Sequence, residues 1–224
     1  KKRNKILKKI SKYSKSIMML PSKNQIINDQ VFYSDLKKIS FLDILNRDSS
    51  KIKKNLIKYL DHSNVLITGA AGSIGSELTS QILKTKAKKI ICLDINETEL
   101  FNLKNNLNYD PRFRFVLCDI NDSFQIMKIL KKYKITQVFH AAAYKHVTML
   151  ENDKVAAIKN NILGTLSIIK CLNNKIKNFT FISTDKAAKP INTLGLTKRF
   201  AELLCLYYSK KLKIKFSIVR FGNV

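Results

Sequence analysis

The feature that most restricts the fold of this chain is a glycine pattern placed directly after a short apolar run. The run covers residues 64–68 and leads into Gly69, Gly72 and Gly75 at the spacing G-x-x-G-x-x-G, and an amphipathic pattern follows them. Strand, tight turn and helix in this order are the context in which such glycines bind the pyrophosphate of a dinucleotide. We expect Gly69 to permit the turn, Gly72 to let the backbone approach the phosphates, and Gly75 to let the helix pack closely on the strand.

The same unit has a second element, an acid at the end of the next apolar run. Residues 89–94 have the pattern of a strand and end at Asp94, about 20 residues after the glycines, where a ribose-binding carboxylate belongs. Ser73 and Ile74 begin the intervening helix, whose free N–H groups would face the phosphates. Asp94 favours NAD, because the 2′-phosphate of NADP would meet a carboxylate. Neighbouring lysines soften this preference, and NADP is the alternative.

From residue 64 onward, short apolar runs alternate with helical patterns. The runs are rich in β-branched and aromatic residues, as buried parallel strands are, and they cover residues 64–68, 89–94, 113–118, 136–140, 178–183 and 214–220. Helical patterns lie between them at residues 73–87, 96–108, 122–133, 152–173 and 193–210. Six strands joined by right-handed crossovers predict an α/β fold, a doubly wound parallel sheet of the Rossmann type with helices on both faces.

The residues that follow the third and fourth runs extend the expected cofactor site. In a sheet of this kind, ligands bind outside the carboxyl ends of the strands. Asp119 and Ile120 follow the third run, and the carboxylate could accept a hydrogen bond from an adenine amino group. Ala141, Ala142 and Ala143 follow the fourth run and leave room for a flat ring against the backbone. We therefore expect both groups to line the dinucleotide site.

Candidate catalytic groups follow the fifth run. Thr184, Asp185 and Lys186 place a hydroxyl, an acid and an amine on consecutive positions. Helix capping explains Thr184 or Asp185 in part, but it does not explain Lys186, which is a candidate base beside an oxidised cofactor. Lys198, in the next helical pattern, would project toward the cofactor, where it could hold the ribose hydroxyls.

Five motifs occur in an order that resembles one known family. They are Gly-Ala-Ala-Gly-Ser-Ile-Gly-Ser-Glu-Leu, His-Ala-Ala-Ala-Tyr-Lys-His-Val, Ser-Thr-Asp-Lys-Ala, Thr-Lys-Arg-Phe-Ala-Glu and Val-Arg-Phe-Gly-Asn-Val. Together they resemble the capsule/polysaccharide-biosynthesis family of nucleotide-sugar 4,6-dehydratases, within the extended short-chain dehydrogenase/reductase superfamily. The resemblance covers residues 64–224 closely. The preceding segment, through Leu20-Pro21 and residues 43–48, also resembles the arm of the large membrane-anchored members.

The resemblance implies a redox-neutral reaction on a UDP-sugar, usually UDP-N-acetylglucosamine. Hydride leaves C4 of the sugar for the cofactor, a base removes the C5 proton, water leaves from C6, and hydride returns to C6. The product is a 4-keto-6-deoxy sugar. By position, Asp185 resembles the acid and Lys186 the base, and Thr184 would hydrogen-bond the C4 oxygen. Contacts with the substrate or the cofactor edge are implied for Lys145, His146 and Asn223.

One position departs from the superfamily pattern. The superfamily pairs the helix lysine with a tyrosine four residues earlier, and here that position is Leu194, four residues before Lys198. The large membrane-type members resemble this chain because they also lack the tyrosine. The base for the C4 hydroxyl is therefore unassigned, with Lys186, Asp185 or a water as candidates.

Two rival functions stay open beside the dehydratase. A C4 epimerase on the same fold would keep the tyrosine and would not need the Asp185–Lys186 pair, so the sequence disfavours it. A non-catalytic, cofactor-binding scaffold of polysaccharide assembly is kept open by Leu194.

Composition bears on other classes of protein. The 224 residues carry 42 Lys and Arg against 16 Asp and Glu, a net charge of +26. Lysines far outnumber arginines and no basic run is interleaved with aromatics, which disfavours nucleic-acid binding. No apolar run reaches the about 18 residues that span a bilayer.

The widely spaced cysteines predict buried, reduced thiols and no metal site: Cys92, Cys118, Cys171 and Cys205.

The beginning of the chain differs from the rest. We expect residues 1–60 to form a basic arm that packs against a dinucleotide-binding domain at residues 61–224, with a substrate lobe beyond it. Residues 1–15 hold eight basic residues and no acid, which fits either a frayed terminus or the cytoplasmic flank of a membrane segment preceding this chain. We expect a homo-oligomer at the cytoplasmic face of the inner membrane.

Overall fold

A computed structural model describes residues 18–19, 37–38, 58–107 and 110–222 of the chain. The chain divides into two units, Lys1–Lys53 and Lys54–Val224. In the first unit, β1 (Met18–Met19) pairs antiparallel with β2 (Lys37–Lys38). Most of the expected arm lies outside the described residues, so its division from the domain at residue 60 stays a prediction.

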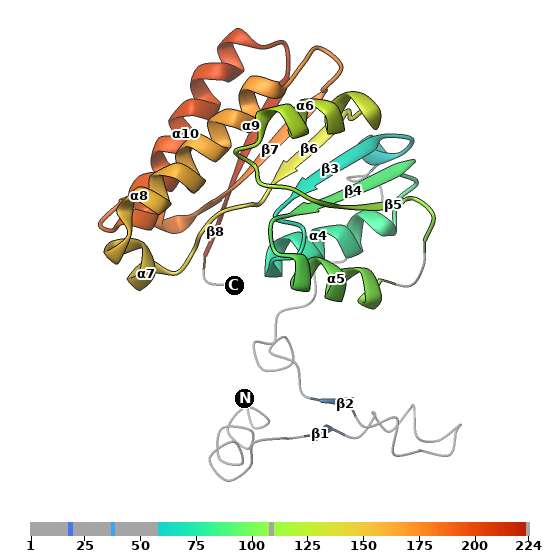
Figure 1. The fold of residues 1–224 in the computed structure, drawn as a ribbon, viewed down its shortest axis with the longest axis horizontal. Coiled ribbons are helices and arrows are strands. Elements are labelled where there is room, and N and C mark those ends of the chain that lie inside the picture. The colour runs from blue at the N-terminus through green and yellow to red at the C-terminus, as the bar shows by residue number, and fades with distance from the viewer. Residues whose placement is uncertain (1–17, 20–36, 39–57, 108–109, 223–224) are drawn as a thin grey trace, which may run out of the picture. The chain divides into compact units, whose positions relative to one another are not determined.

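The second unit is built on a six-stranded sheet (Figure 1). Its strands are β3 (Asn64–Thr68), β4 (Lys89–Asp94), β5 (Phe113–Leu117), β6 (Gln137–His140), β7 (Asn178–Thr184) and β8 (Lys215–Phe221). Their order is β5-β4-β3-β6-β7-β8, and every neighbouring pair is parallel. The order reverses between β3 and β6, which is the switch point where such sheets bind ligands. The predicted doubly wound parallel sheet is confirmed, and each strand end lies within one residue of its predicted position.

Helices join the strands and cover both faces of the sheet (Figure 1). The strands β3, β4 and β5 are followed by α4 (Ser73–Leu83), α5 (Glu97–Asn106) and α6 (Ser123–Lys132). Between β6 and β7 lie α7 (Val147–Asn152), α8 (Lys154–Ala157), the π-helical segment η3 (Ile158–Gly164) and α9 (Thr165–Cys171). After β7 come the 3-10 turn η4 (Asp185–Ala187) and α10 (Thr193–Lys211).

The prediction of a single helix over residues 152–173 is wrong at its start. Asp153 ends α7, which the pattern did not predict, and begins α8 as its N-cap, with the carboxylate accepting a hydrogen bond from Ala156 N at 2.9 Å. Aspartate is a favoured N-cap because it satisfies a free N–H of the first turn. From Lys154 to Cys171 the chain is helical, with η3 in the middle of this stretch.

The helix expected at residues 73–87 ends early, at Leu83. The guanidinium of Arg112 donates to the carbonyl oxygens of Leu83 at 2.9 Å and Thr85 at 2.8 Å. These bonds satisfy carbonyls that a longer helix would have paired internally. The stop signal for α4 therefore comes from a residue far along the sequence.

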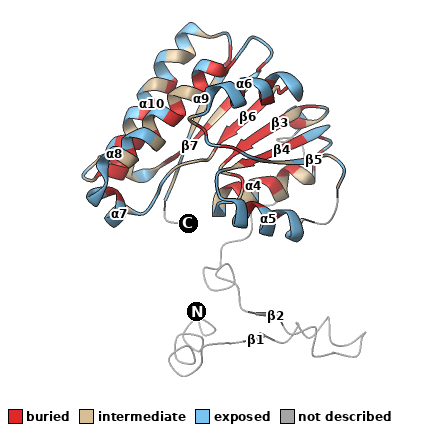
Figure 2. Ribbon diagram, in the orientation of Figure 1, coloured by how far each residue is buried: buried red, intermediate tan, exposed pale blue. Residues whose placement is uncertain are grey.

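The core has two parts, one on each face of the sheet. Alternate residues of a strand point to opposite faces, so Leu66 belongs to the cluster shared with α6, α9 and α10, whereas Val65 and Ile67 belong to the cluster shared with α4 and α5. Buried residues are concentrated in the strands and on the helix sides that face them (Figure 2). The four cysteines are buried and free, as the sequence predicted. In the described part of the chain, no helix has both the length and the apolar character to cross a membrane.

Candidate active site

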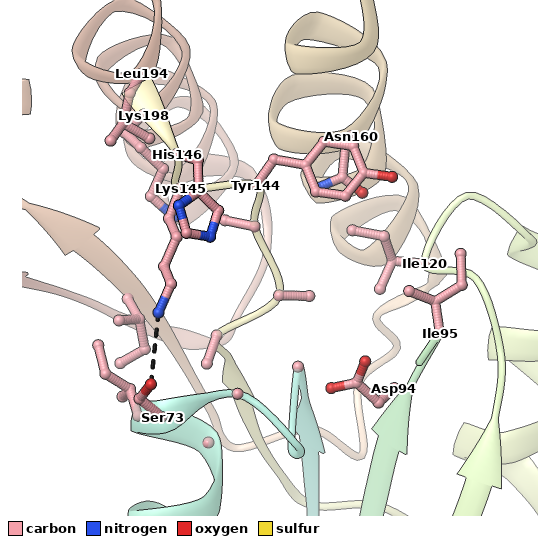
Figure 3. A pocket seen from close by; sticks show the side chains of 18 of the residues that line it. Ser73, Asp94, Ile95, Ile120, Tyr144, Lys145, His146, Asn160, Leu194 and Lys198 are labelled. Carbon is pink, nitrogen blue, oxygen red and sulfur yellow. Dashed lines mark hydrogen bonds between the residues drawn. The ribbon is translucent and has the colours of Figure 1, made fainter. Parts of the chain in front are cut away.

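A cleft of about 880 Å³ lies along the carboxyl edge of the sheet. Figure 3 shows Ser73 and Asp94 on one side of it, and Leu194 and Lys198 from α10 on the other. The predicted site residues that line it are Gly69, Gly72, Ser73, Ile74, Gly75, Asp94, Asp119, Ile120, Ala141, Ala142, Ala143, Lys145, His146, Thr184, Lys186 and Lys198. Asp185 is not among the lining residues, and Asn223 lies outside the described residues.

The glycine turn is too tightly packed for side chains at two of its three positions. Gly69 has φ of +66°, and a Cβ there would lie 2.5 Å from Ala142 N. A Cβ on Gly75 would overlap the carbonyl oxygen of Gly69. A Cβ on Gly72 would meet only that same oxygen, at 3.4 Å, so packing does not require a glycine there. The first two glycines let α4 and the alanine strand end approach the turn, and Gly72 keeps the backbone open toward the cleft.

The carboxylate of Asp94 ties the end of β4 to the glycine turn. One oxygen accepts a hydrogen bond from Ala71 N at 2.9 Å, and the other accepts one from Asn96 N at 3.0 Å. The side chain is half-buried and faces the cleft (Figure 3). Each oxygen keeps a second lone pair, so the carboxylate can still accept hydrogen bonds from a ribose diol.

Asn161 holds the loop that follows the alanines, a role that the sequence reasoning missed. Its amide oxygen accepts from Tyr144 N at 2.8 Å, and its amide nitrogen donates to Tyr144 O at 3.1 Å. The same nitrogen donates to Thr197 Oγ1 at 3.2 Å, and the side chain is 1% exposed. The sequence feature that could have identified Asn161 is a polar residue on the buried side of a helix. Its partners lie 17 and 36 residues away and are known only from the fold.

His140 belongs to a buried polar chain beneath the same loop. Thr165 Oγ1 donates its proton to Asn161 O at 2.7 Å, so it must accept the hydrogen bond from His140 Nε2 at 2.9 Å. His140 Nδ1 then carries no proton and accepts a hydrogen bond from Thr68 Oγ1 at 2.6 Å. Burial, reinforced by the nearby charge of Lys198, lowers the pKa of His140 to about 3. The imidazole is therefore neutral at neutral pH and serves to connect β3, β6 and α9.

Lys145 and His146 lie at the mouth of the cleft. Lys145 Nζ donates to Ser73 Oγ at 3.4 Å, which spans from the loop after β6 to the start of α4 (Figure 3). His146 is the N-cap residue of α7, and both side chains are exposed. Lys145 thus places an amine beside the start of α4, next to the glycine turn, where a diphosphate would need partners.

The residues after β7 form a compact hydrogen-bonded group. Thr184 Oγ1 donates to Asp185 Oδ1 at 3.0 Å and accepts from Lys186 N at 3.4 Å, and Lys186 Nζ lies 3.4 Å from Asp185 Oδ1. The hydrogen bond from Thr184, together with those from Lys186, holds the pKa of Asp185 below its ordinary value. Asp185 is therefore a carboxylate at neutral pH, with the amine of Lys186 beside it.

Lys198 is the buried amine of the cleft. Its residue is 5% exposed, and Nζ lies 4.1 Å from the centre of the Phe181 ring. Burial lowers the pKa of Lys198 to about 7, although Cys205 and Glu202 act in the opposite direction. Leu194, one helical turn earlier, is also buried and lines the cleft.

Glu202 is a second residue that the sequence reasoning missed. It is 1% exposed, and its carboxylate accepts hydrogen bonds from Ser183 at 2.7 Å, from Arg220 at 2.8 and 2.6 Å, and from Arg199 at 3.1 Å. These bonds join α10 to the ends of β7 and β8. Burial raises the pKa of Glu202, but the hydrogen bonds from Arg220, Ser183 and Arg199 outweigh it and lower the pKa to about 2.

Comparison with known proteins assigns the family. Residues 65–224 match the family described as "Polysaccharide biosynthesis protein". The chain belongs to this family. This polysaccharide biosynthesis family is the one that the five motifs resemble, within the extended short-chain dehydrogenase/reductase superfamily.

Three relatives illustrate the range of the similarity. The chain is 35% identical to the capsular polysaccharide biosynthesis protein CapD of Staphylococcus aureus, over 93% of this chain and 36% of that protein. It is 33% identical to a UDP-N-acetylglucosamine 4,6-dehydratase (inverting) of Campylobacter jejuni, over 72% of this chain and 49% of that enzyme. It is also 33% identical to a UDP-glucose 4-epimerase of Rickettsia bellii, over 71% of this chain and 48% of that enzyme. The chain thus spans about a third to a half of the length of these relatives.

Proposed function

We propose that this protein is an NAD-dependent nucleotide-sugar 4,6-dehydratase that acts on UDP-N-acetylglucosamine. The observation that carries the proposal is the hydrogen-bonded group of Thr184, Asp185 and Lys186, of which Thr184 and Lys186 line the same cleft as the glycine turn. A hydroxyl, a carboxylate and an amine within contact of one another can take a proton from one sugar carbon and give a proton to the hydroxyl on the next carbon. Identity to the dehydratase and the epimerase is equal, so the choice between them rests on these residues.

The described residues fit a dinucleotide. Gly69 and Gly75 allow the turn, α4 and the alanine strand end to pack closely, and Gly72 has no side chain that would fill the pyrophosphate space. Within the described residues no side chain caps the N-terminus of α4, so the N–H groups of Ser73 and Ile74 stay available for phosphate oxygens. Asp94 would accept from the ribose hydroxyls and favours NAD over NADP, which is the alternative. Asp119 and Ile120 would lie at the adenine, and the three alanines after β6 at a flat ring.

The proton transfers would be carried by the residues after β7. Bound NAD would supply the hydride acceptor for C4 and the hydride donor for C6. Thr184 would hold the C4 oxygen by a hydrogen bond, and Lys186 would take the C5 proton once the neighbouring ketone acidifies it. Because Asp185 is ionised at neutral pH, it must first gain a proton before it can protonate the leaving C6 hydroxyl. Its contact with Lys186 Nζ at 3.4 Å offers a route for that proton.

The charged mouth of the cleft would hold the nucleotide part of the substrate. Lys145 and His146 lie there, and the lysine-rich chain adds a positive field that attracts a UDP group. Asn223, next to the cleft residue Gly222, would contact the substrate or cofactor edge. The proposal also covers the state of the whole protein. We propose that it is attached to the membrane through a segment preceding this chain, that it lies at the cytoplasmic face of the inner membrane, and that it forms a homo-oligomer.

The alternatives differ in what they require. A C4 epimerase would keep the superfamily tyrosine, where this chain has Leu194, and it would not need the Asp185–Lys186 pair, because it neither deprotonates C5 nor expels the C6 hydroxyl. A non-catalytic scaffold would need the cofactor site but not the hydrogen-bonded group after β7, which it leaves without a purpose.

The test uses the full-length protein that contains this chain. It is incubated with UDP-N-acetylglucosamine without added reductant, and the product is analysed by mass spectrometry. We expect a product lighter by one water while the bound cofactor ends in its starting redox state. An unchanged sugar mass with a new C4 configuration would identify an epimerase, and an unchanged sugar with bound NAD would identify a scaffold.

A further inference from the structure

The reaction proposed above needs a base that the site has not yet been given. Hydride can leave C4 only if the proton of the C4 hydroxyl leaves as well. Leu194 occupies the position where a phenol would stand, and its side chain is 7% exposed and packs in an apolar cluster with Leu150, Ala157 and Val147. This corner of the cleft therefore offers no hydroxyl from α10 at that position.

The nearest ionisable group on α10 is the amine of Lys198, one turn further along. Lys198 lines the cleft and is 5% exposed (Figure 3). The Nζ atom of Lys198 lies over the face of the Phe181 ring, and among the described residues it has no hydrogen-bond or ion-pair partner. Lys186, by contrast, lies against the carboxylate of Asp185. Lys198 is thus the cleft amine that combines deep burial with the lack of a described carboxylate partner.

The carboxylate that would normally hold a proton on Lys198 is engaged elsewhere. Glu202 is four residues further along α10, the spacing of a helical ion pair. Its two oxygens instead accept hydrogen bonds from Ser183, Arg199 and Arg220. The carboxylate of Glu202 is therefore paired with two arginines, and its remaining attraction for the Lys198 ammonium does not outweigh burial.

Burial lowers the pKa of Lys198 more than Glu202 raises it, and two further titratable groups nearby do not oppose burial at neutral pH. His140 on β6 is neutral at neutral pH, and any charge on it would repel the ammonium. Burial raises the pKa of the Cys205 thiol to about 12, so this thiol is also uncharged at neutral pH. Desolvation then favours the neutral amine, which is the form that can accept a proton.

We propose that Lys198, as a neutral amine, is the general base that removes the proton of the sugar's C4 hydroxyl. The lone pair of Nζ bonds the proton, the O–H electrons form the C4 carbonyl, and the C4 hydrogen leaves as hydride to the oxidised nicotinamide dinucleotide. Over a full cycle Lys198 gains one proton and Asp185 gives one to the leaving hydroxyl, and exchange with cleft water restores both. This role rests on the proposed dehydratase function and deepens it.

The charge of Lys198 can be measured without turnover. The full-length protein is labelled with trace acetic anhydride over a range of pH, and the acetylated fraction of each lysine is quantified by peptide mass spectrometry. We expect Lys198 to react with a midpoint near neutral pH, about three units below the usual lysine value of about 10.4 that surface lysines follow. A Lys198 midpoint equal to that of the surface lysines would overturn the inference.

A pair of variants tests the role in the reaction. Lys198→Arg keeps the donors for ribose but is permanently protonated and cannot act as a base at neutral pH, so dehydration should fall about 100-fold or more while NAD binding persists. Lys189→Arg, an exposed site outside the cleft, is the matched control and should keep the parent rate. In Lys198→Ala, added methylamine should restore turnover in proportion to the free-base concentration.

The outcomes separate the two proposals. An active parent whose Lys198→Arg variant keeps its rate would overturn the role of Lys198 and leave the dehydratase assignment standing. A parent that forms no dehydrated product would overturn the proposed function, and the role of Lys198 with it.

Discussion

Asp94 Oδ2 and the backbone nitrogen of Ala71 are 2.9 Å apart, so the acid at the end of β4 is hydrogen-bonded to the glycine turn that follows β3. One carboxylate thus shapes the turn and faces the space where a ribose would lie. We expect Asp94→Ala to weaken NAD binding about tenfold or more and NADP binding less, because only NADP gains by losing a negative charge near its 2′-phosphate. Isothermal titration with both cofactors measures this. Glu77→Ala, on the exposed side of α4, is the control, and an unchanged NAD preference would mean that the ribose is recognised elsewhere.

The glycine turn allows a comparison between two glycines of one motif. Gly75→Ala places a methyl group on the Gly69 carbonyl, so it should lower the free energy of unfolding by about 1–3 kcal/mol and the melting temperature by about 2–10 °C. Gly72→Ala has room for its methyl group and should leave the melting temperature close to that of the parent while weakening NAD binding. Thermal unfolding followed by circular dichroism, with and without NAD, compares them. Equal destabilisation by both substitutions would contradict the packing described for this turn.

The buried carboxylate of Glu202 predicts a dependence of stability on pH. Its pKa in the folded protein is about 2, below the about 4.3 of an unfolded chain. A lowered pKa means that the stabilisation is present above the unfolded value and is lost as the pH falls from about 4.3 toward 2. Glu202→Gln should remove about 3–5 kcal/mol at neutral pH and flatten this acid limb. Denaturant titrations at several pH values measure both effects, and an acid limb of unchanged steepness in the variant would assign it to other carboxyl groups.

Lys186 provides the most direct test of the catalytic group after β7. Lys186→Met should reduce water loss about 100-fold or more, because it removes the base for the C5 proton, and should leave NAD binding intact because Lys186 is not part of the glycine turn. Lys189→Met, three residues along and exposed, is the matched control. Product formation by mass spectrometry and NAD affinity by titration are the two readouts. Full turnover in Lys186→Met would remove this residue from the mechanism.

The sheet could be predicted from sequence because its strands are buried on both faces. A run such as residues 89–94 is almost continuously apolar, which distinguishes it from the surrounding helices without any tertiary information. The glycines and Asp94 were found for a similar reason, since their spacing follows from the local geometry of strand, turn and helix. The alternation of runs and helical patterns also led to the correct doubly wound parallel sheet, because crossovers of this length are right-handed.

What the sequence could not supply depends on contacts between distant segments. Arg112 ends α4 from 29 residues beyond Leu83, and no local signal in the helix marks that point. Asn161 and Glu202 are polar residues on otherwise buried helix faces, and their roles follow only from their partners at Tyr144, Ser183 and Arg220. The low pKa of Lys198 likewise depends on burial, which outweighs the opposing effect of Glu202, and neither contribution is visible in the spacing of residues.

In the reaction that we propose, hydride leaves C4 of the nucleotide sugar for the cofactor and returns to C6 after water has left. The most direct measurement uses UDP-N-acetylglucosamine that carries deuterium at C4, incubated with the full-length protein and unlabelled NAD. We expect a 4-keto-6-deoxy product in which the deuterium has moved to C6 of the same molecule. A dehydrated product without deuterium at C6, or recovered sugar that keeps its deuterium at C4 with C6 unchanged, would contradict it.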